Sequence, residues 1–155
     1  MVEQLLETWR TNNRINLFLI DHISDEGMAC TLSKRGGRNV VRQFAHMHNQ
    51  RVYHLQGRAP KLATALCKFK GDEEPSKQSL TEALVCSAEW VEVYLRDCAR
   101  GAVKHRCFKK GIIPTLGYFI AHESHHRGSI LLTLKECGQK LDQQTQSAIW
   151  NWDKM

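Results

Sequence analysis

Hydrophobic residues recur along most of this chain at the three- and four-residue spacing of amphipathic helices. In the clearest stretch the steps are four, four, three, four and three residues. The members of this stripe are Leu80, Leu84, Ala88, Val91, Leu95 and Cys98. Such a stripe is typical of a helix that packs into a bundle. Gly101 follows it and predicts the end of the helix, because glycine readily adopts the left-handed conformation of a helix C-terminus.

The same periodicity predicts three more long helices, and a proline and a glycine mark the two ends of the last one. Pro114 lies near the start of the last helix and Gly138 just after its end. The three helices are expected at about residues 2–23, 39–55 and 114–137. Four long helices without a convincing strand indicate an all-α protein built as a four-helix bundle.

The remaining segments are short. Residues 60–76 form a mixed linker, in which we expect a short helix near residues 62–67, and the aromatic tail at residues 149–152 is expected to form a short closing helix. The chain has 155 residues, about the length of one compact domain, and we find no internal repeat. We therefore expect residues 1–155 to form a single domain.

Two asparagines lie in the apolar row of the first helix. Asn12 and Asn16 share the face of Leu5, Trp9 and Leu19. A buried amide destabilises the fold unless it is hydrogen-bonded, so the two side chains either bridge helices or line a polar pocket. We favour the interhelical hydrogen bond.

The charge balance adds one alternative. The formal net charge is +6, and basic residues gather at residues 34–42 and 104–110. Phosphate contacts to a nucleic acid would need a continuous basic patch, and no helix-turn-helix spacing or aromatic stacking motif accompanies these residues. We interpret them as a solvated basic surface and expect no nucleic-acid partner.

Part of this basic surface is the glycine-containing loop Ser33–Arg38, which precedes the second helix. Such a loop can hold an anion at a helix N-terminus. It lacks the spacing of a phosphate-binding P-loop, however, and no strand precedes it. An ordinary interhelical loop is the favoured interpretation.

We infer the compartment and the state of the cysteines from the lack of a signal peptide and of a membrane-spanning segment. The N-terminus carries acidic residues where a signal peptide needs basic ones, and no apolar run is long enough to span a bilayer. We therefore expect a cytoplasmic protein without a membrane partner. In that reducing compartment the six cysteines are expected to be thiols, and no C-x-x-C pair favours a zinc knuckle.

The eight histidines carry the strongest chemical signal. His122 and His126 are four residues apart on the last long helix, so both can reach one metal ion. Two ligands bind a metal poorly, and the second helix offers His46 and His48 as a third. Helical phase places His48 nearer the apolar row and His46 at its edge, so periodicity alone leaves the choice open.

The segments around these histidines carry a resemblance. Ala45-His46-Met47-His48-Asn49-Gln50-Arg51 and Ala121-His122-Glu123-Ser124-His125-His126-Arg127-Gly128 resemble the two signature regions of the DinB/YfiT-like superfamily. Trp9-Arg10-Thr11-Asn12 and the tryptophan-bearing tail are similar to other parts of that family. The resemblance covers nearly the whole chain. Ser129 is a departure, since many relatives have glutamine there.

The resemblance implies a four-helix bundle of up-down-down-up type, a homodimer, and one divalent metal ion held by His46, His122 and His126. It leaves His48 off the metal. Zinc or nickel is the metal we expect first, with iron or manganese as alternatives. The implied function is a metal-dependent enzyme that acts on a small molecule, either as a transferase or isomerase using a low-molecular-weight thiol or as a hydrolase. No catalytic residue is assigned.

Three alternatives accompany this interpretation. The first is a metal-binding stress-response protein without catalysis. The second is a metalloprotease, suggested by the H-E-x-x-H spacing of His122, Glu123 and His126; little chain follows to build a substrate cleft, so we reject it. The third concerns Arg51 and Arg127, which could hold a substrate carboxylate, although an exposed helix arginine is the simpler interpretation of each.

Overall fold

The computed structural model describes residues 1–101, 103 and 106–155. In this part of the chain all regular structure is helical and no strand is present. The elements are α1 (Val2–His22), α2 (Asp25–Ala29), α3 (Val40–Arg58), the 3₁₀ turn η1 (Pro60–Ala63), α4 (Lys77–Arg100), α5 (Ile112–Glu136) and α6 (Gln143–Ala148). The expectation of an all-α protein with four long helices is thus confirmed.

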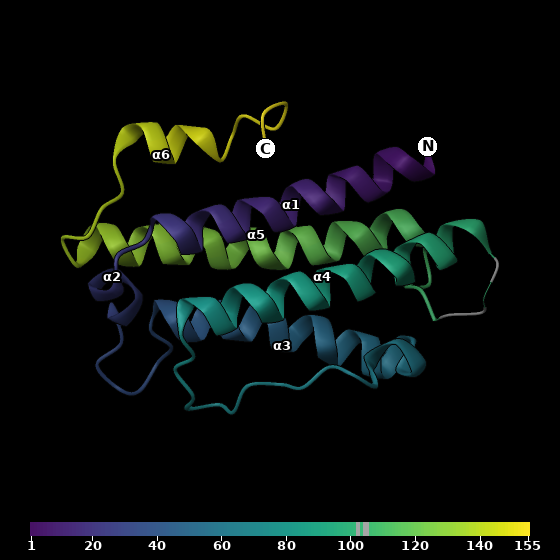
Figure 1. Cartoon of the computed structure of the whole chain (residues 1–155), viewed down its shortest axis with the longest axis horizontal. Helices are drawn as coiled ribbons and strands as arrows, with labels where there is room; N and C mark the ends of the chain where they lie inside the picture. The colour runs from purple at the N-terminus through teal and green to yellow at the C-terminus, as the bar shows by residue number, and fades with distance from the viewer. Residues whose placement is uncertain (102, 104–105) are drawn as a thin grey trace.

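The four long helices pack side by side (Figure 1). Helices α1 and α5 run in one direction and α3 and α4 in the other, as the colour sequence in Figure 1 shows. Around the bundle α1 contacts α4 and α5, and α3 contacts the same two helices. Since α3 and α4 run in the same direction, the chain between them, including η1, has to return along the length of the bundle.

The helix ends agree with the sequence signals to within a few residues. Gly101 ends α4 with a φ of 65°, in the left-handed region that favours glycine. At the other end of α4 the Ser76 side chain accepts a hydrogen bond from the Ser79 amide, which caps the helix. Gly138 likewise follows α5 with a φ of 74°.

Three short segments differ from the predictions. The helix expected at residues 62–67 is the 3₁₀ turn η1, which ends at Ala63. The aromatic tail 149–152 forms turns, and the closing helix α6 lies just before it. Helix α2 was not predicted; Ser24 caps it by accepting a hydrogen bond from the Gly27 amide, and it is too short to show hydrophobic periodicity.

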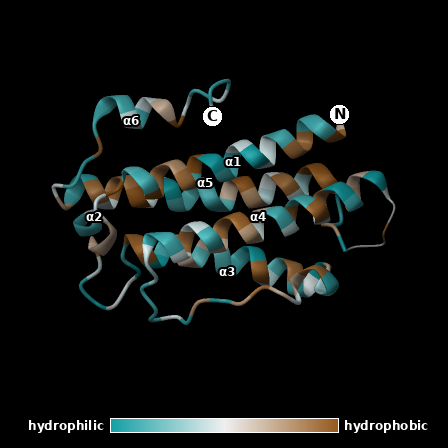
Figure 2. Ribbon diagram, in the orientation of Figure 1, coloured by the Kyte–Doolittle hydropathy of each residue, from teal (hydrophilic) through white to brown (hydrophobic). Residues whose placement is uncertain are grey.

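The predicted stripe on α4 faces the core. Leu80, Leu84, Val91 and Leu95 are fully buried. The hydrophobic core forms two clusters, one around Phe44 and the other around Trp9, and Figure 2 shows the alternation of hydrophobic and hydrophilic residues along the long helices. Core packing of this kind supplies most of the stability of helices in a bundle.

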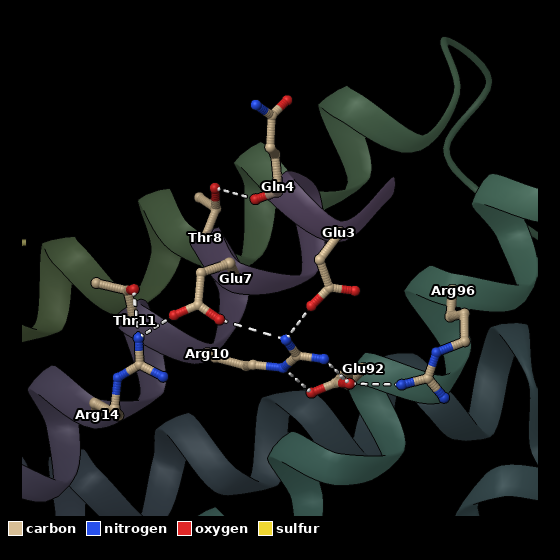
Figure 3. A network of polar contacts seen from close by, with 9 residues as sticks. All are labelled: Glu3, Gln4, Glu7, Thr8, Arg10, Thr11, Arg14, Glu92 and Arg96. Atoms are coloured by element: carbon tan, nitrogen blue, oxygen red, sulfur yellow. Dashed lines mark hydrogen bonds and ion pairs between the residues drawn. The ribbon is translucent and has the colours of Figure 1, made fainter. Parts of the chain in front are cut away.

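The outer seam between α1 and α4 is polar (Figure 3). Arg10 of α1 donates two hydrogen bonds to the Glu92 carboxylate of α4, at 2.9 and 2.8 Å, and Arg96 donates to the same carboxylate at 2.6 Å. Arg14 pairs with Glu7 on α1 itself. Exposed ion pairs contribute little free energy singly, so this network orients the seam more than it stabilises the fold.

The cysteine expectation needs a correction. Cys98 near the end of α4 and Cys107 form a disulfide that bridges the connection to α5. The other four cysteines, Cys30, Cys67, Cys86 and Cys137, are free. Sequence separation says nothing about the proximity of two side chains across a turn, which is why the pair was not predicted.

No helix in the described ranges is both long enough and apolar enough to cross a membrane.

Candidate metal centre

Three histidines from two adjacent helices meet on one side of the bundle. His122 and His126 are one turn apart on α5, and His46 faces them from α3. One nitrogen from each of the three rings can be chosen so that all lie within 4.8 Å of one another. The ring centroids are 4.7 Å apart for His122 and His126, and 4.8 Å apart for His46 and His126. A single ion could touch all three nitrogens.

Helix α3 presents His46 to this cluster and turns His48 away from it. His48 is 2% exposed; its Nδ1 lies 3.0 Å from the Ala83 carbonyl oxygen and its Nε2 2.8 Å from the Cys67 carbonyl oxygen. His48 therefore ties α3 to α4 and to the linker. The helical phase correctly predicted that His48 points inward. At this position, however, the inward side of α3 faces backbone carbonyl groups of α4 and the linker and not the histidine cluster.

The electrostatics of the cluster favour neutral imidazole, the form that binds metals. Burial is the main cause that lowers the pKa of His46 and of His126 to about 4, and it also lowers the pKa of His122. The Nδ1 atom of His126 is buried and has no hydrogen-bond partner within the described part of the chain. A buried nitrogen without a partner is costly, so these residues fit a metal ion.

A buried ion pair lies beside the cluster. Arg51 of α3 donates two hydrogen bonds to the Glu123 carboxylate of α5, at 2.6 and 2.9 Å. Arg51 also donates to the Asn13 side chain at 2.9 Å and to the Leu84 carbonyl at 2.8 Å. Both members of the pair are almost completely buried, and the Arg51 charge and hydrogen bonds lower the pKa of Glu123 against the opposing effect of burial.

The two asparagines of α1 complete this network. Asn12 and Asn16 each donate to the Glu123 carboxylate at 2.7 Å, which confirms the expected interhelical hydrogen bonds. Arg127 donates to the side-chain Oδ1 of Asn16 at 2.8 Å. The interpretation of Arg51 and Arg127 as exposed helix arginines is wrong, because both are buried.

The same network argues against the metalloprotease alternative. In that class the glutamate next to the first histidine acts as a general base on metal-bound water. Here Glu123 is 1% exposed and its oxygens accept hydrogen bonds from Arg51, Asn12 and Asn16. Glu123 has a structural role in the core.

Two further side chains lie near the cluster: His54, which the sequence predicts to be a surface or edge residue, and Tyr118, which the sequence analysis did not single out. His54 lies two turns after His46 on α3, and Tyr118 lies one turn before His122 on α5. The Tyr118 ring stacks on His122 with a centroid distance of 6.1 Å and contacts His54 at 4.8 Å. Burial lowers the pKa of His54 to about 4, and its Nε2 has no hydrogen-bond partner among the described residues. The signal available in the sequence was helical spacing, since His54 follows His46 by eight residues and Tyr118 precedes His122 by four.

Of the three remaining histidines, the two in the described ranges are not part of the cluster. His125 is exposed on α5, next to His126. His22 is exposed at the end of α1, where its Nδ1 lies 2.8 Å from the Phe18 carbonyl oxygen. His105 and Lys104, part of the second basic segment, lie outside the described residues.

Comparison of the chain with protein-family models, with curated proteins and with solved structures finds no match in any of the three. What the structure establishes is an all-helical protein with a cluster of three histidines that could hold a metal ion.

Proposed function

We propose that the protein is a metal-dependent enzyme in which His46, His122 and His126 bind one divalent ion. The observation that carries this proposal is the approach of their three ligand atoms to within 4.8 Å of one another. The lowered pKa values of all three rings and the unpartnered Nδ1 of His126 support it.

Three protein ligands leave at least one coordination position open, which is typical of a catalytic metal and not of a closed structural site. When bound, such an ion lowers the pKa of a water or thiol ligand and so supplies a nucleophile near neutral pH. Zinc or nickel suits three imidazoles best, and iron or manganese is compatible with them.

The DinB/YfiT-like superfamily is the family that we infer for this chain. Its support is the pair of histidine motifs together with the arrangement in which α1 and α5 run against α3 and α4 (Figure 1). The inferred family implies a homodimer and a small-molecule substrate. The reaction class that follows is a thiol-dependent transfer or isomerisation, or a hydrolysis.

The decisive experiment measures metal content by elemental analysis of the full chain, purified without a histidine tag and soaked in zinc or nickel. We expect about one ion per chain. The variants His46→Ala, His122→Ala and His126→Ala should each lose most of the metal. His125→Ala is the matched control, because His125 is adjacent in sequence and exposed.

Two results would overturn the metal site. One is a metal content below about a tenth of an ion per chain after soaking, far less than a preformed three-ligand site retains. The other is a loss of metal in His125→Ala as large as in His126→Ala. Retained metal with no turnover of thiol or ester substrates would leave the non-catalytic alternative.

A further inference from the structure

A cationic cavity lies directly beside His46. Its volume is about 270 Å³, and it is enclosed by the loop before α3, the first half of α3 and the linker near Lys70. The lining residues that matter here are Gly37, Arg38, Arg42, His46, Asn49 and Lys70. The cavity is smaller than a drug-sized site, so it suits one polar group of a small metabolite.

Three positive charges surround this cavity against one carboxylate. Arg38, Arg42 and Lys70 supply the cations and Glu73 the carboxylate. Among the residues that the structure describes, no carboxylate oxygen lies within 4.0 Å of any of these three cationic groups. A focus of unpaired positive charge in a concave site attracts anions.

The linker holds part of this arrangement in place. Arg42 donates from Nε and Nη2 to the Gly71 carbonyl oxygen, at 3.1 and 2.6 Å, which orients its guanidinium at the cavity wall. The Glu73 carboxylate accepts a hydrogen bond from the Lys70 amide at 2.8 Å and so stabilises the linker turn. The Asn39 side chain already caps α3 by accepting from the Arg42 amide. Side chains, and not the helix N-terminus, therefore provide the binding groups.

The cavity and the histidine cluster are continuous. His46 belongs to both. The His46 ring lies 5.3 Å from the His122 ring and 4.8 Å from the His126 ring, measured between centroids. Arg38 lines the same cavity as His46, so an anion bound by Arg38 would lie beside the cluster.

We propose that this cavity binds the anionic group, a carboxylate or a phosphate, of the small molecule whose reacting atom is placed at the histidine cluster. This inference rests on the proposed function, because the cluster is the site of reaction there. Arg38 and Lys70 are the main anchors, because the Arg42 guanidinium already donates to the Gly71 carbonyl oxygen, whereas no hydrogen bond or ion pair within the described ranges occupies the head groups of the other two. Charge-assisted hydrogen bonds to such anchors orient a substrate as well as binding it.

The test is an NMR titration of the metal-free full chain with two probes, inorganic phosphate and malonate. The amide signals of residues 36–38 and 70–73 should shift on addition of the preferred probe. In the double variant Arg38→Gln with Lys70→Gln we expect the affinity for that probe to fall at least about tenfold. The matched control is Arg35→Gln with Lys68→Gln, which removes the same two charges from neighbouring exposed positions outside the cavity.

The outcomes separate this proposal from the metal proposal. The anion site fails if neither probe shifts those signals, or if both double variants weaken binding equally, which would indicate diffuse charge attraction. Suppose that the wild-type chain holds no metal, and that Arg38→Gln with Lys70→Gln loses the anion while Arg35→Gln with Lys68→Gln retains it. The metal proposal then fails and the anion site stands. Preference for phosphate over malonate, or the reverse, identifies the anionic group of the substrate class. In a metal-loaded sample the same probe should bind more tightly, because the ion adds positive charge beside His46.

Discussion

The guanidinium of Arg51 and the carboxylate of Glu123 form a two-bond pair, at 2.6 and 2.9 Å, between α3 and α5 in the core of the bundle. These are the two helices that carry the histidine cluster, with Arg51 five residues after His46 and Glu123 next to His122. The pair therefore sets how the two halves of the proposed metal site face each other. It draws Asn12 and Asn16 of α1 into the same network.

Removing Arg51 should be strongly destabilising. Arg51→Met leaves the Glu123 carboxylate buried without its cation, which typically costs about 3–5 kcal/mol of the free energy of unfolding. Urea denaturation measures this loss. Arg96→Met, at the more exposed seam with Glu92, is the control and should cost about 1 kcal/mol or less. A change of similar size in both variants would contradict the structural role of the pair.

Substitutions of His48 and His46 should affect different properties: stability for His48 and metal binding for His46. His48→Ala removes a buried ring that lies against the carbonyl oxygens of Ala83 and Cys67, and we expect a loss of about 2 kcal/mol or more in the free energy of unfolding. Its metal content should stay near that of the wild type. His46→Ala should behave in the opposite way, with the metal lost and the stability changed less. If His48→Ala loses the metal and His46→Ala retains it, the ligand assignment is wrong.

His46 and His126 should take up protons only near pH 4. Burial lowers the pKa of His46 and His126 to about 4, whereas an unfolded histidine titrates near 6.5. Between these values the unfolded state binds more protons than the folded state, so the free energy of unfolding falls as the pH is lowered through this window. NMR titration of the metal-free protein should show both rings moving only near pH 4. Ring signals that titrate near pH 6.5 would contradict the observed burial.

The Cys98–Cys107 disulfide predicts a thiol count. Alkylation of the denatured, unreduced protein should label four cysteines, and alkylation after reduction should label all six. The bridge closes a short loop, so replacing both residues by serine should cost about 2–3 kcal/mol of the free energy of unfolding. Cys86→Ser with Cys137→Ser is the control for a general cost of losing cysteines. Six reactive thiols before reduction would show that the pair is open in solution.

Helical periodicity predicted more of the fold than of the site. The stripe from Leu80 to Leu95, the stop at Gly101 and the pairing of His122 with His126 all depend on the geometry of one helix, which is regular enough to read from spacing. Helix α2 and the 3₁₀ turn η1 could not be predicted well, because segments of four or five residues contain too little periodicity.

The sequence alone determined the four long helices, their buried stripes and the two histidines that share a face of α5. Periodicity left the choice between His46 and His48 open and the family resemblance implied His46; the tertiary structure places His46 beside the other two histidines. Only the tertiary structure decided that Glu123 pairs with Arg51 and that Lys70 lines a cavity beside Arg38. The physical reason is that the spacing within a helix is local, whereas contacts between helices depend on how each one is rotated and shifted against its neighbours. That rotation is the outcome of packing over the whole core.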